Sequence, residues 1–217
     1  TDKRFVRTRK EVLKKDVSSL SLVRDPEKCI LCGRCVAVCS EMQTVKAIDF
    51  AGRGVKTHIA TYLDMPMGSV ACTNCGQCAL VCPTGAITEK SSVSEVWDAI
   101  HNPAKTVIVQ TAPAIRVGIG EAMGMAAGSL VTGKMVAGLR RLGFSKVFDT
   151  NFTANLTIIE EGNELLKRIK TGGKLPMITS CSPGWIKFIE HFFPASLGHL
   201  STCKSPQQMF GAVAKTY

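Results

Sequence analysis

The spacing of apolar and polar positions changes at about Ser91. After this point, short apolar runs alternate with longer segments in which apolar residues recur every three to four positions. Short apolar runs bounded by turn residues predict strands, and the longer periodicity predicts helices. The alternation therefore predicts an α/β layer structure for the C-terminal part of the chain.

The same pattern assigns the individual elements of this part. We expect strands in three apolar runs, at 105–113, 146–152 and 175–181. We expect helices over 114–143, with glycine breaks, and over 157–170 and 183–193. Polar or reactive residues that follow strands are where α/β proteins place their sites. The loops after these strands are therefore the first places to look for chemistry.

A glycine-containing stretch lies inside the first helical segment. Gly118, Gly120 and Gly124 are spaced as G-x-G-x-x-x-G. A dinucleotide-binding loop requires G-x-G-x-x-G directly after a strand. We therefore do not expect a nucleotide site there.

The part of the chain before Ser91 is dominated by cysteine. The chain has 217 residues and 10 cysteines, and eight of these cysteines fall between Cys29 and Cys82. A secreted disulfide framework would spread its cysteines over a small chain. Dense C-x-x-C runs in a chain without an export signal indicate metal binding instead.

Two cysteine runs, KCILCGRCVAVCS and ACTNCGQCALVCPTGAI, share the spacing C-x2-C-x2-C-x3-C. This is the pattern of bacterial ferredoxins with two 4Fe-4S clusters, in which the fourth cysteine of each run ligates the other cluster. The predicted ligands are Cys29, Cys32, Cys35 and Cys82 for the first cluster, and Cys72, Cys75, Cys78 and Cys39 for the second. A pair of zinc sites, the alternative, would leave the third cysteine of each run without a role.

The two runs indicate an internal duplication, but the repeat is imperfect. They begin at Cys29 and Cys72, 43 residues apart, and each is followed by a short strand-like segment. Ser40 and Glu41 follow the last cysteine of the first run, where the second run has Pro83. The insert between the runs is also longer than a minimal ferredoxin loop. We expect the turn to differ and the ligands to be kept.

Length and composition set the domain organisation. A chain of 217 residues with 45% hydrophobic and 20% charged residues fits one large or two small globular domains. We predict a basic N-terminal linker at 1–19, an α+β ferredoxin-like domain with two 4Fe-4S clusters at 20–92, and an α/β domain at 93–217. No apolar run reaches the roughly 18 residues of a membrane span, and the N-terminus is too polar for a signal peptide. We therefore expect a soluble, cytoplasmic protein.

The formal net charge is +10 with neutral cysteines, and two clusters of about −2 each would leave roughly +6. Much of the excess lies in an N-terminal arm, which contains Lys3, Arg4, Arg7, Arg9, Lys10, Lys14 and Lys15. Nucleic-acid binding is one interpretation of such an arm. No aromatic platform or helix-turn-helix pattern accompanies it, so we favour a linker or a docking surface for another subunit.

Four motifs in the C-terminal part, together with the eight cysteines, resemble the catalytic subunit of iron-iron (FeFe) hydrogenases. They are TAPAIRVGIGEAMG, VFDTNFTANLTIIEEGNELL, MITSCSPGWIKFIEHFFP and LSTCKSPQQMFGAVAKTY, and the resemblance covers about residues 20–217. It implies that residues 93–217 are the first part of an H-cluster domain. The implied activity is the interconversion of dihydrogen with protons and electrons. The implied cofactor is the H-cluster, a 4Fe-4S cubane bridged by cysteine to a diiron centre, and the ferredoxin clusters would carry electrons to it.

The loop TSCSPGW departs from the family pattern TSCCPGW. By resemblance Cys181 is the proton-relay thiol, and Ser182 stands where a cubane ligand is usual. An alkoxide is a harder and more basic ligand than a thiolate. We therefore hypothesise that Cys203 supplies this ligand, with ligation by Ser182 as the alternative.

The resemblance also implies a proton route through Cys181, Glu161, Ser201 and Glu164. Glu161 and Glu164 are three residues apart on one predicted helix, so they share a face. A plain solvated acidic face is the alternative interpretation. Ala112, Pro113 and Ala114 match the loop that lines the diiron pocket, and Gln208 and Met209 are candidate contacts near it. Asn155, where aspartate is usual, is interpreted as a minor structural change.

The chain ends before the motifs that supply the remaining cubane ligands in the family. We expect a fragment, a partial subunit or one half of a split enzyme. Two functions remain open: part of a hydrogen-converting enzyme, or a non-catalytic or sensory electron-transfer relative. The expected partners are dihydrogen and protons as substrates, and a ferredoxin or a flavin-containing, NAD-linked subunit in a hetero-oligomer.

Overall fold

The computed structural model describes residues 13–216, so the N-terminal basic residues Lys3, Arg4, Arg7, Arg9 and Lys10 lie outside the described residues. Contacts within the chain define two units. The cluster unit consists of the described residues up to Ser91 together with Pro183–Ala195. The second unit consists of Ser92–Ser182 and Ser196 onward. Within residues 13–216, no helix combines the length and apolar character needed to cross a membrane.

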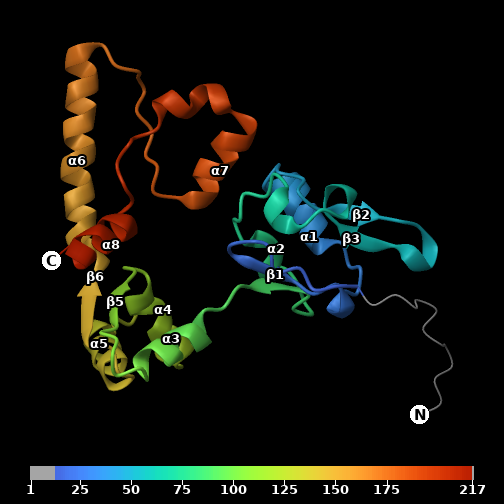
Figure 1. Cartoon of the computed structure of the whole chain (residues 1–217), viewed down its shortest axis with the longest axis horizontal. Helices are drawn as coiled ribbons and strands as arrows, with labels where there is room; N and C mark the ends of the chain where they lie inside the picture. The colour runs from blue at the N-terminus through green and yellow to red at the C-terminus, as the bar shows by residue number, and fades with distance from the viewer. Residues whose placement is uncertain (1–12, 217) are drawn as a thin grey trace. The chain divides into compact units, whose positions relative to one another are not determined.

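The cluster unit is built from short elements (Figure 1). Its strands are β1 (Leu22–Arg24), β2 (Asp49–Ala51), β3 (His58–Ala60) and β4 (Ile87–Glu89). Its helices are α1 (Arg34–Ala37), α2 (Gln77–Leu80) and α7 (Pro183–Phe192). Short helical turns cover Pro26–Lys28, Val38–Met42, Gly54–Lys56, Tyr62–Asp64 and Met67–Ser69. This mixture is the α+β composition that the sequence predicts.

Two antiparallel pairs frame the cluster unit. Strand β1 pairs with β4, with Arg24 opposite Ile87. The strand before the first cysteine run thus pairs with the strand after the second. Strand β2 pairs with β3, with Phe50 opposite Ile59, and this hairpin comes from the insert between the two cysteine runs. The buried core is small and contains Leu22, Cys35, Val38, Ile48, Ile59, Met67, Cys78 and Ile87. Two of the predicted cluster ligands are therefore core residues.

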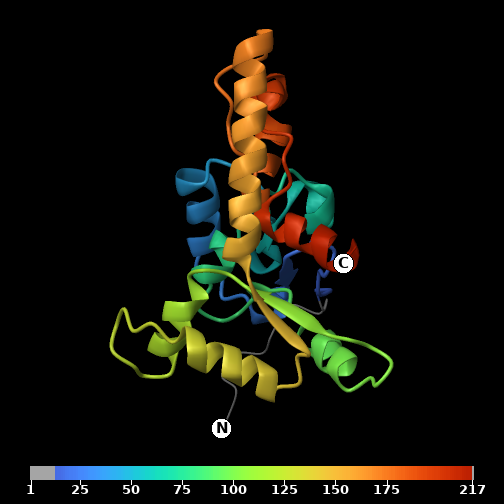
Figure 2. The same ribbon diagram turned by 90° about the vertical axis from the view of Figure 1, so that its left-hand side faces the viewer.

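The second unit is organised around a parallel pair of strands. Its elements are α3 (Val93–Ile100), β5 (Ile108–Thr111), α4 (Ile115–Ala122), α5 (Thr132–Arg141), β6 (Lys146–Asp149), α6 (Thr150–Thr171) and α8 (Pro206–Thr216). A short helix covers Pro194–His199, where the chain passes from the cluster unit to the second unit. Strands β5 and β6 run parallel, as the βαβ pattern predicts, and β6 leads directly into the long helix α6 (Figure 2).

The structure corrects several element boundaries. The predicted helix over 114–143 is two helices, because the chain turns at Gly124 and Gly128, both with positive φ near 80°. Helix α6 begins at Thr150 instead of 157 because Asp149 caps it: the carboxylate accepts the Asn151 N–H at 2.9 Å.

The strand predicted over 175–181 is wrong. The structure has one isolated bridge there, between Ile178 and Leu200. Pro176 has no N–H to donate to a neighbouring strand, so the apolar run stays an extended loop with little pairing.

Helix α6 packs on α8 through a polar contact in an apolar setting. The Thr157 hydroxyl donates to the Thr153 carbonyl at 2.9 Å and lies 3.3 Å from the sulfur of Met209. Thr153, Thr157 and Met209 are all buried. The contact determines which side of α6 faces α8. Glu161 and Glu164 follow Thr157 by four and seven residues, so helical periodicity places them on the same side of α6.

Asp149→Ala should destabilise the second unit by about 1 kcal/mol, because the substitution removes the cap of α6. It also removes the ion pair with Arg116, in which the nitrogen and oxygen lie 3.2 Å apart. Asp149→Asn is the matched control, since asparagine caps as well as aspartate and removes only the charge. Urea unfolding followed by circular dichroism measures both variants, and equal destabilisation by Ala and Asn would contradict the cap.

Candidate cluster cavities and the Glu164 network

The two cysteine runs adopt the same backbone conformation. In the first run, Leu31 and Gly33 have positive φ, at 58° and 73°, and in the second run Asn74 and Gly76 match them, at 56° and 79°. These left-handed turns direct backbone N–H groups at sulfur. Leu31 N lies 3.4 Å from the sulfur of Cys29, and Asn74 N lies 3.4 Å from that of Cys72. N–H groups aimed at cysteine sulfur suit a thiolate, which carries negative charge.

The third cysteine of each run enters the core at the start of a short helix. Cys35 lies on α1 and Cys78 on α2, and both side chains are buried. Gly33 precedes α1 with a left-handed φ, and a side chain at this position would crowd the ring of Phe50. Glycine is therefore needed here on both conformational and packing grounds.

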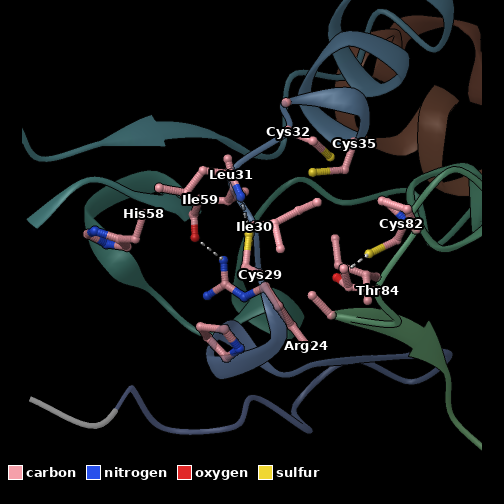
Figure 3. Close-up of a pocket in the computed structure, with 15 residues that line it drawn as sticks. Arg24, Cys29, Ile30, Leu31, Cys32, Cys35, His58, Ile59, Cys82 and Thr84 are labelled. Atoms are coloured by element: carbon pink, nitrogen blue, oxygen red, sulfur yellow. Dashed lines mark hydrogen bonds between the residues drawn. The ribbon is translucent and has the colours of Figure 1, made fainter. Parts of the chain in front are cut away.

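The first cavity is lined by Cys29, Cys32, Cys35 and Cys82, which are the four predicted ligands of the first cluster (Figure 3). The cavity has a volume of about 70 Å³, and its other walls are largely apolar, with Ile30, Ile59 and Ile87 among them. Cys82 comes from the second run, so the lining combines three cysteines of the first run with the fourth cysteine of the second.

The second cavity shows the reciprocal arrangement. Cys72, Cys75 and Cys78 line it together with Cys39 from the first run, and its volume is about 20 Å³. The sulfur of Cys39 accepts the N–H of Ala47 at 3.3 Å. Apolar side chains, including Leu22, Ile48 and Met67, close its walls.

The chemistry of these donors fits iron-sulfur cubes. Four thiols surround each cavity, and in residues 13–216 no group of three or more His, Cys, Asp or Glu side chains is placed to hold a single metal ion. Burial, together with the charge of Cys29, raises the pKa of Cys35 to about 11, and burial with the charge of Cys72 raises that of Cys78 to about 12. Such thiols lose their protons when iron supplies the compensating charge.

The pKa of Cys82 is shifted in the opposite direction, below its ordinary value. Burial raises its pKa, but the backbone N–H groups of Ile87, Thr84 and Ala86 outweigh burial and lower it below the ordinary value. The Thr84 hydroxyl also lies 3.9 Å from the Cys82 sulfur. The cysteine that completes the first cavity thus has surroundings that favour a thiolate.

In the second unit, one carboxylate on α6 collects several hydrogen bonds. Glu164 Oε2 accepts from the hydroxyl of Ser201 at 3.1 Å and from the N–H and hydroxyl of Thr202 at 3.0 and 3.1 Å. On the other oxygen, the Nε of Arg168 donates at 3.0 Å. Burial raises the pKa of Glu164, but the hydrogen bonds from Arg168, Thr202 and Ser201 are stronger and lower it to about 2.

Arg168 connects this network to the loop before α8. Besides Glu164, its guanidinium donates to the carbonyls of Lys174 at 3.1 Å and Leu200 at 2.7 Å. Neither Arg168 nor Thr202 was predicted as a site residue from the sequence. The spacing of Glu164 and Arg168, four residues apart with the acid first, was the available signal.

Most members of the predicted proton route converge. Glu164 and Ser201 are hydrogen-bonded, and Glu161 is close enough to Cys203 for its charge to raise the Cys203 pKa, after the larger effects of burial and Glu164. Cys181 is exposed, and the adjacent Ser180 ties its loop to the Ser201 carbonyl at 3.0 Å. The structure gives no direct contact between Cys181 and Glu161.

Cys203 lies beside Glu164. Its sulfur is 3.6 Å from Oε2 of Glu164, and its N–H donates to the Ser201 hydroxyl at 3.2 Å. Ser182 is exposed. A thiol that donates to a carboxylate is protonated, whereas a cubane ligand is a thiolate.

The remaining predicted residues have mainly structural contacts. Ala112, Pro113 and Ala114 form the exposed loop between β5 and α4, and Ala112 also lines an apolar cavity of about 580 Å³. Gln208 exchanges two hydrogen bonds with Ser205 at the start of α8, in the reciprocal pattern of a capping box. Met209 is buried against α6, and Asn155 is exposed on α6.

Double variants test the crossed ligand sets. Cys39→Ala with Cys75→Ala should remove one cluster and about half of the iron, because both cysteines line the same cavity. Cys39→Ala with Cys32→Ala should remove both clusters. Iron and sulfide analysis of the reconstituted chain measures the difference. The reverse result, with Cys39 and Cys32 costing only one cluster, would show that the sets are not crossed.

The lowered pKa of Glu164 predicts a pH-dependent contribution to stability. The folded carboxylate titrates near 2 and the ordinary value is 4.5, so the contribution is complete above about pH 5 and is lost as pH falls from there toward 2. Glu164→Gln should therefore lower the unfolding free energy at pH 7, and its difference from the parent should shrink at pH 3. The exposed neighbour Glu160→Gln is the control. A pH-independent difference would contradict the assignment.

Comparisons with known proteins agree with this geometry. Residues 28–86 match the family model for a 4Fe-4S dicluster domain, and residues 105–217 match that for the iron only hydrogenase large subunit, C-terminal domain. The chain is 53% identical over 210 residues to the NADP-reducing hydrogenase subunit HndD of Solidesulfovibrio fructosivorans, covering 94% of this chain and 36% of that protein. It is 44% identical over 202 residues to iron hydrogenase 1 of Clostridium pasteurianum, covering 93% and 35%.

A solved structure of apo [FeFe]-hydrogenase HydA1 from Chlamydomonas reinhardtii has a TM-score of 0.56 and 46% identity, over 59% of this chain and 34% of that one. The chain thus spans about a third of the length of these relatives. The predicted order, an α+β ferredoxin-like domain for two 4Fe-4S clusters followed by part of an α/β H-cluster domain, is confirmed. This chain belongs to the family of iron-only hydrogenase large subunits.

Proposed function

We propose that this chain is part of the catalytic subunit of an FeFe hydrogenase, which converts dihydrogen reversibly to protons and electrons. One observation carries the proposal: a single chain combines two crossed cysteine cavities with a TSCSPGW loop that is hydrogen-bonded to the Glu164 network. The first feature suits electron transfer and the second suits proton transfer. A hydrogenase needs both, because each dihydrogen yields two electrons and two protons.

The electron path uses the two cavities of the cluster unit. We assign Cys29, Cys32, Cys35 and Cys82 to one 4Fe-4S cluster and Cys72, Cys75, Cys78 and Cys39 to the other. The clusters, when bound, supply one-electron carriers, and the chain's part is to hold them in an apolar wall with N–H groups aimed at the sulfurs. The crossed fourth ligands hold the two sites within one small core.

The identity of the electron partner is a further part of the proposal. HndD is named as a subunit of an NADP-reducing hydrogenase. By similarity to it, we propose that this chain works in a cytoplasmic hetero-oligomer with a flavin-containing, NAD(P)-linked subunit, a soluble ferredoxin being the other candidate. Six large apolar side chains of α6 are exposed, which supports further polypeptide covering this helix: Phe152, Ile158, Ile159, Leu165, Leu166 and Ile169.

The proton path runs through Cys181, Glu161, Ser201 and Glu164. Cys181 is exposed at the end of its loop, where a thiol can exchange protons with the H-cluster side of the route. Glu161 is the carboxylate that accepts and releases a proton, because it is partly exposed and free of the donors that surround Glu164. Glu164, with a pKa near 2, stays ionised at neutral pH and orients the Ser201 hydroxyl. By resemblance, Ala112, Pro113 and Ala114 would line the pocket of the diiron centre, and Gln208 and Met209 would be contacts near it.

The departure at Ser182 leaves one cubane ligand to be assigned. We propose Cys203 for it, as the free thiol closest in sequence to that loop. This role requires the Cys203 thiol to lose its proton and to turn away from Glu164, which now accepts its hydrogen bond. Ligation by the Ser182 hydroxyl is the competing assignment.

Ser182 also favours a second function. A chain that keeps both ferredoxin clusters but has a serine at a cubane ligand position suits a sensory or electron-transfer relative without turnover. Infrared spectra of the purified, cofactor-loaded subunit distinguish the two functions. By resemblance, the diiron centre of the H-cluster carries carbon monoxide and cyanide ligands, which give characteristic infrared bands. These bands together with hydrogen evolution support the enzyme, and the bands without turnover support the sensor. Absence of the bands would overturn both assignments of the second unit.

Glu161→Gln should lower the rate of hydrogen evolution by about 100-fold, because the amide cannot pass a proton on. Glu160→Gln is the matched control, since it removes a neighbouring exposed carboxylate from the same helix. The assay is hydrogen evolution from a reduced dye, with the infrared bands as a check that the cofactor is present. Full activity in Glu161→Gln, with the bands intact, would contradict the proposed route.

A further inference from the structure

One partly buried cation lies in the wall of the first cysteine cavity. Arg24, at the end of β1, lines this cavity together with its four cysteines (Figure 3), and its side chain is only 12% exposed. Its Nη1 donates to the carbonyl of Ile59 at 3.3 Å. Its Nε is buried and has no hydrogen-bond partner within the described residues. A buried N–H donor without a partner is costly unless a further acceptor is present.

The position of Arg24 is fixed by Asp16. The two residues form an antiparallel bridge, with N–H to carbonyl distances of 2.8 and 2.9 Å, and Nη2 lies 3.9 Å from Oδ2 of Asp16. Asp16 also accepts the Met67 N–H at 2.8 Å. Burial raises the pKa of Asp16, but hydrogen bonds from Ser18 and Met67 and the charge of Arg24 lower it overall. Asp16 does not line the cavity, so the positive member of the pair is the one next to the cysteines.

Apart from the cysteines and Arg24, His58 is the one titratable residue among the described residues that line the two cavities. His58 also lines the first cavity, but its ring is engaged by the Lys56 carbonyl at 2.9 Å and by Asp64 at 2.8 Å. Among the described residues that line the second cavity, none is Arg, Lys, Asp or Glu. Burial raises the pKa of Cys72 at this cavity, and the charge of Lys187 on α7 opposes the rise only weakly.

A cation in this place favours the reduced form of a cluster. When a 4Fe-4S cluster with four thiolates takes up one electron, its charge changes from about −2 to about −3, and no bond is formed or broken. The interaction with a nearby positive charge becomes stronger by one unit of charge, and burial reduces the screening by water. A hydrogen bond to a cluster sulfur acts in the same direction.

We propose that Arg24 raises the reduction potential of the first cluster, with its guanidinium facing that cluster and its Nε–H available to a sulfur of the cluster. Arg24 is a positioning and tuning residue and takes no part in ligation. The pair with Asp16 sets how much of the charge the cluster experiences. The inference rests on the proposed ligand set of the first cavity.

The test is an EPR-monitored redox titration of the chain with both clusters reconstituted, using dithionite as the reductant. Arg24→Met should make reduction of one cluster at least tenfold less favourable, a shift of about 59 mV or more to lower potential. Asp16→Asn should shift the same cluster in the opposite direction, because it leaves the Arg24 charge unopposed. Arg24→Lys, which keeps a cation, should change the potential less than Arg24→Met does.

Opposite shifts distinguish tuning from a structural role, since damage to the cavity would move both variants in the same direction. The exposed Arg53→Met is the matched control and should leave both potentials unchanged. If Arg24→Met fails to take up iron, Asp16→Asn alone decides: no shift, or a downward shift, overturns the proposal. Normal iron content with unchanged potentials would overturn the role of Arg24 and leave the ligand set standing. The ligand sets themselves are tested separately, by the iron content of the cysteine double variants.

Discussion

The cluster unit depends on one constraint: eight thiols must surround two cavities inside a very small core. Cys35 and Cys78 are buried in the same core as Leu22 and Ile48. Clusters bound to these cysteines would therefore be part of the interior of the unit and not of its surface. Burial holds these two thiols in the protonated form, and only iron provides the charge that removes their protons. Folding of this unit and cluster binding are therefore expected to be coupled, and with the proposed crossed ligands each cluster would link the two cysteine runs.

In the second unit, the Glu164 network has the comparable role. The carboxylate and Arg168 together hold the loop that carries Ser201 and Cys203 against α6, through side-chain and carbonyl contacts. A carboxylate with this many donors stays ionised and serves best as an anchor. Glu161, one turn earlier on the same helix, lacks these donors and is better suited to carry a proton. The two acids of one helix face thus have different surroundings, and the proposed proton route gives them different roles for that reason.

The sequence predicted what depends on local spacing and missed what depends on distant contacts. The cysteine pattern predicted both cavities, since three-residue spacing and a left-handed turn are local properties of each loop. The strand over 175–181 failed because an apolar run does not reveal whether a neighbouring strand pairs with it, and Pro176 also removes one donor for such pairing. Arg24 was missed for the same reason: its contacts, Asp16 and Ile59, are 8 and 35 residues away, and no periodicity marks them.

The insert between the two cysteine runs accounts for the asymmetry of the repeat. It breaks the duplication in the sequence, and in the structure it forms the β2–β3 hairpin. This hairpin supplies the Ile59 carbonyl that holds Arg24 and also places His58 on the wall of the first cavity. The ligands and loop geometry of the two sites are matched, so a difference in potential has to arise from what surrounds them. The cation itself comes from β1, before the first run, and the insert supplies the carbonyl that holds it beside the first site. With the proposed role of Arg24, two chemically identical clusters would have different electron affinities, and an electron would favour the first cluster.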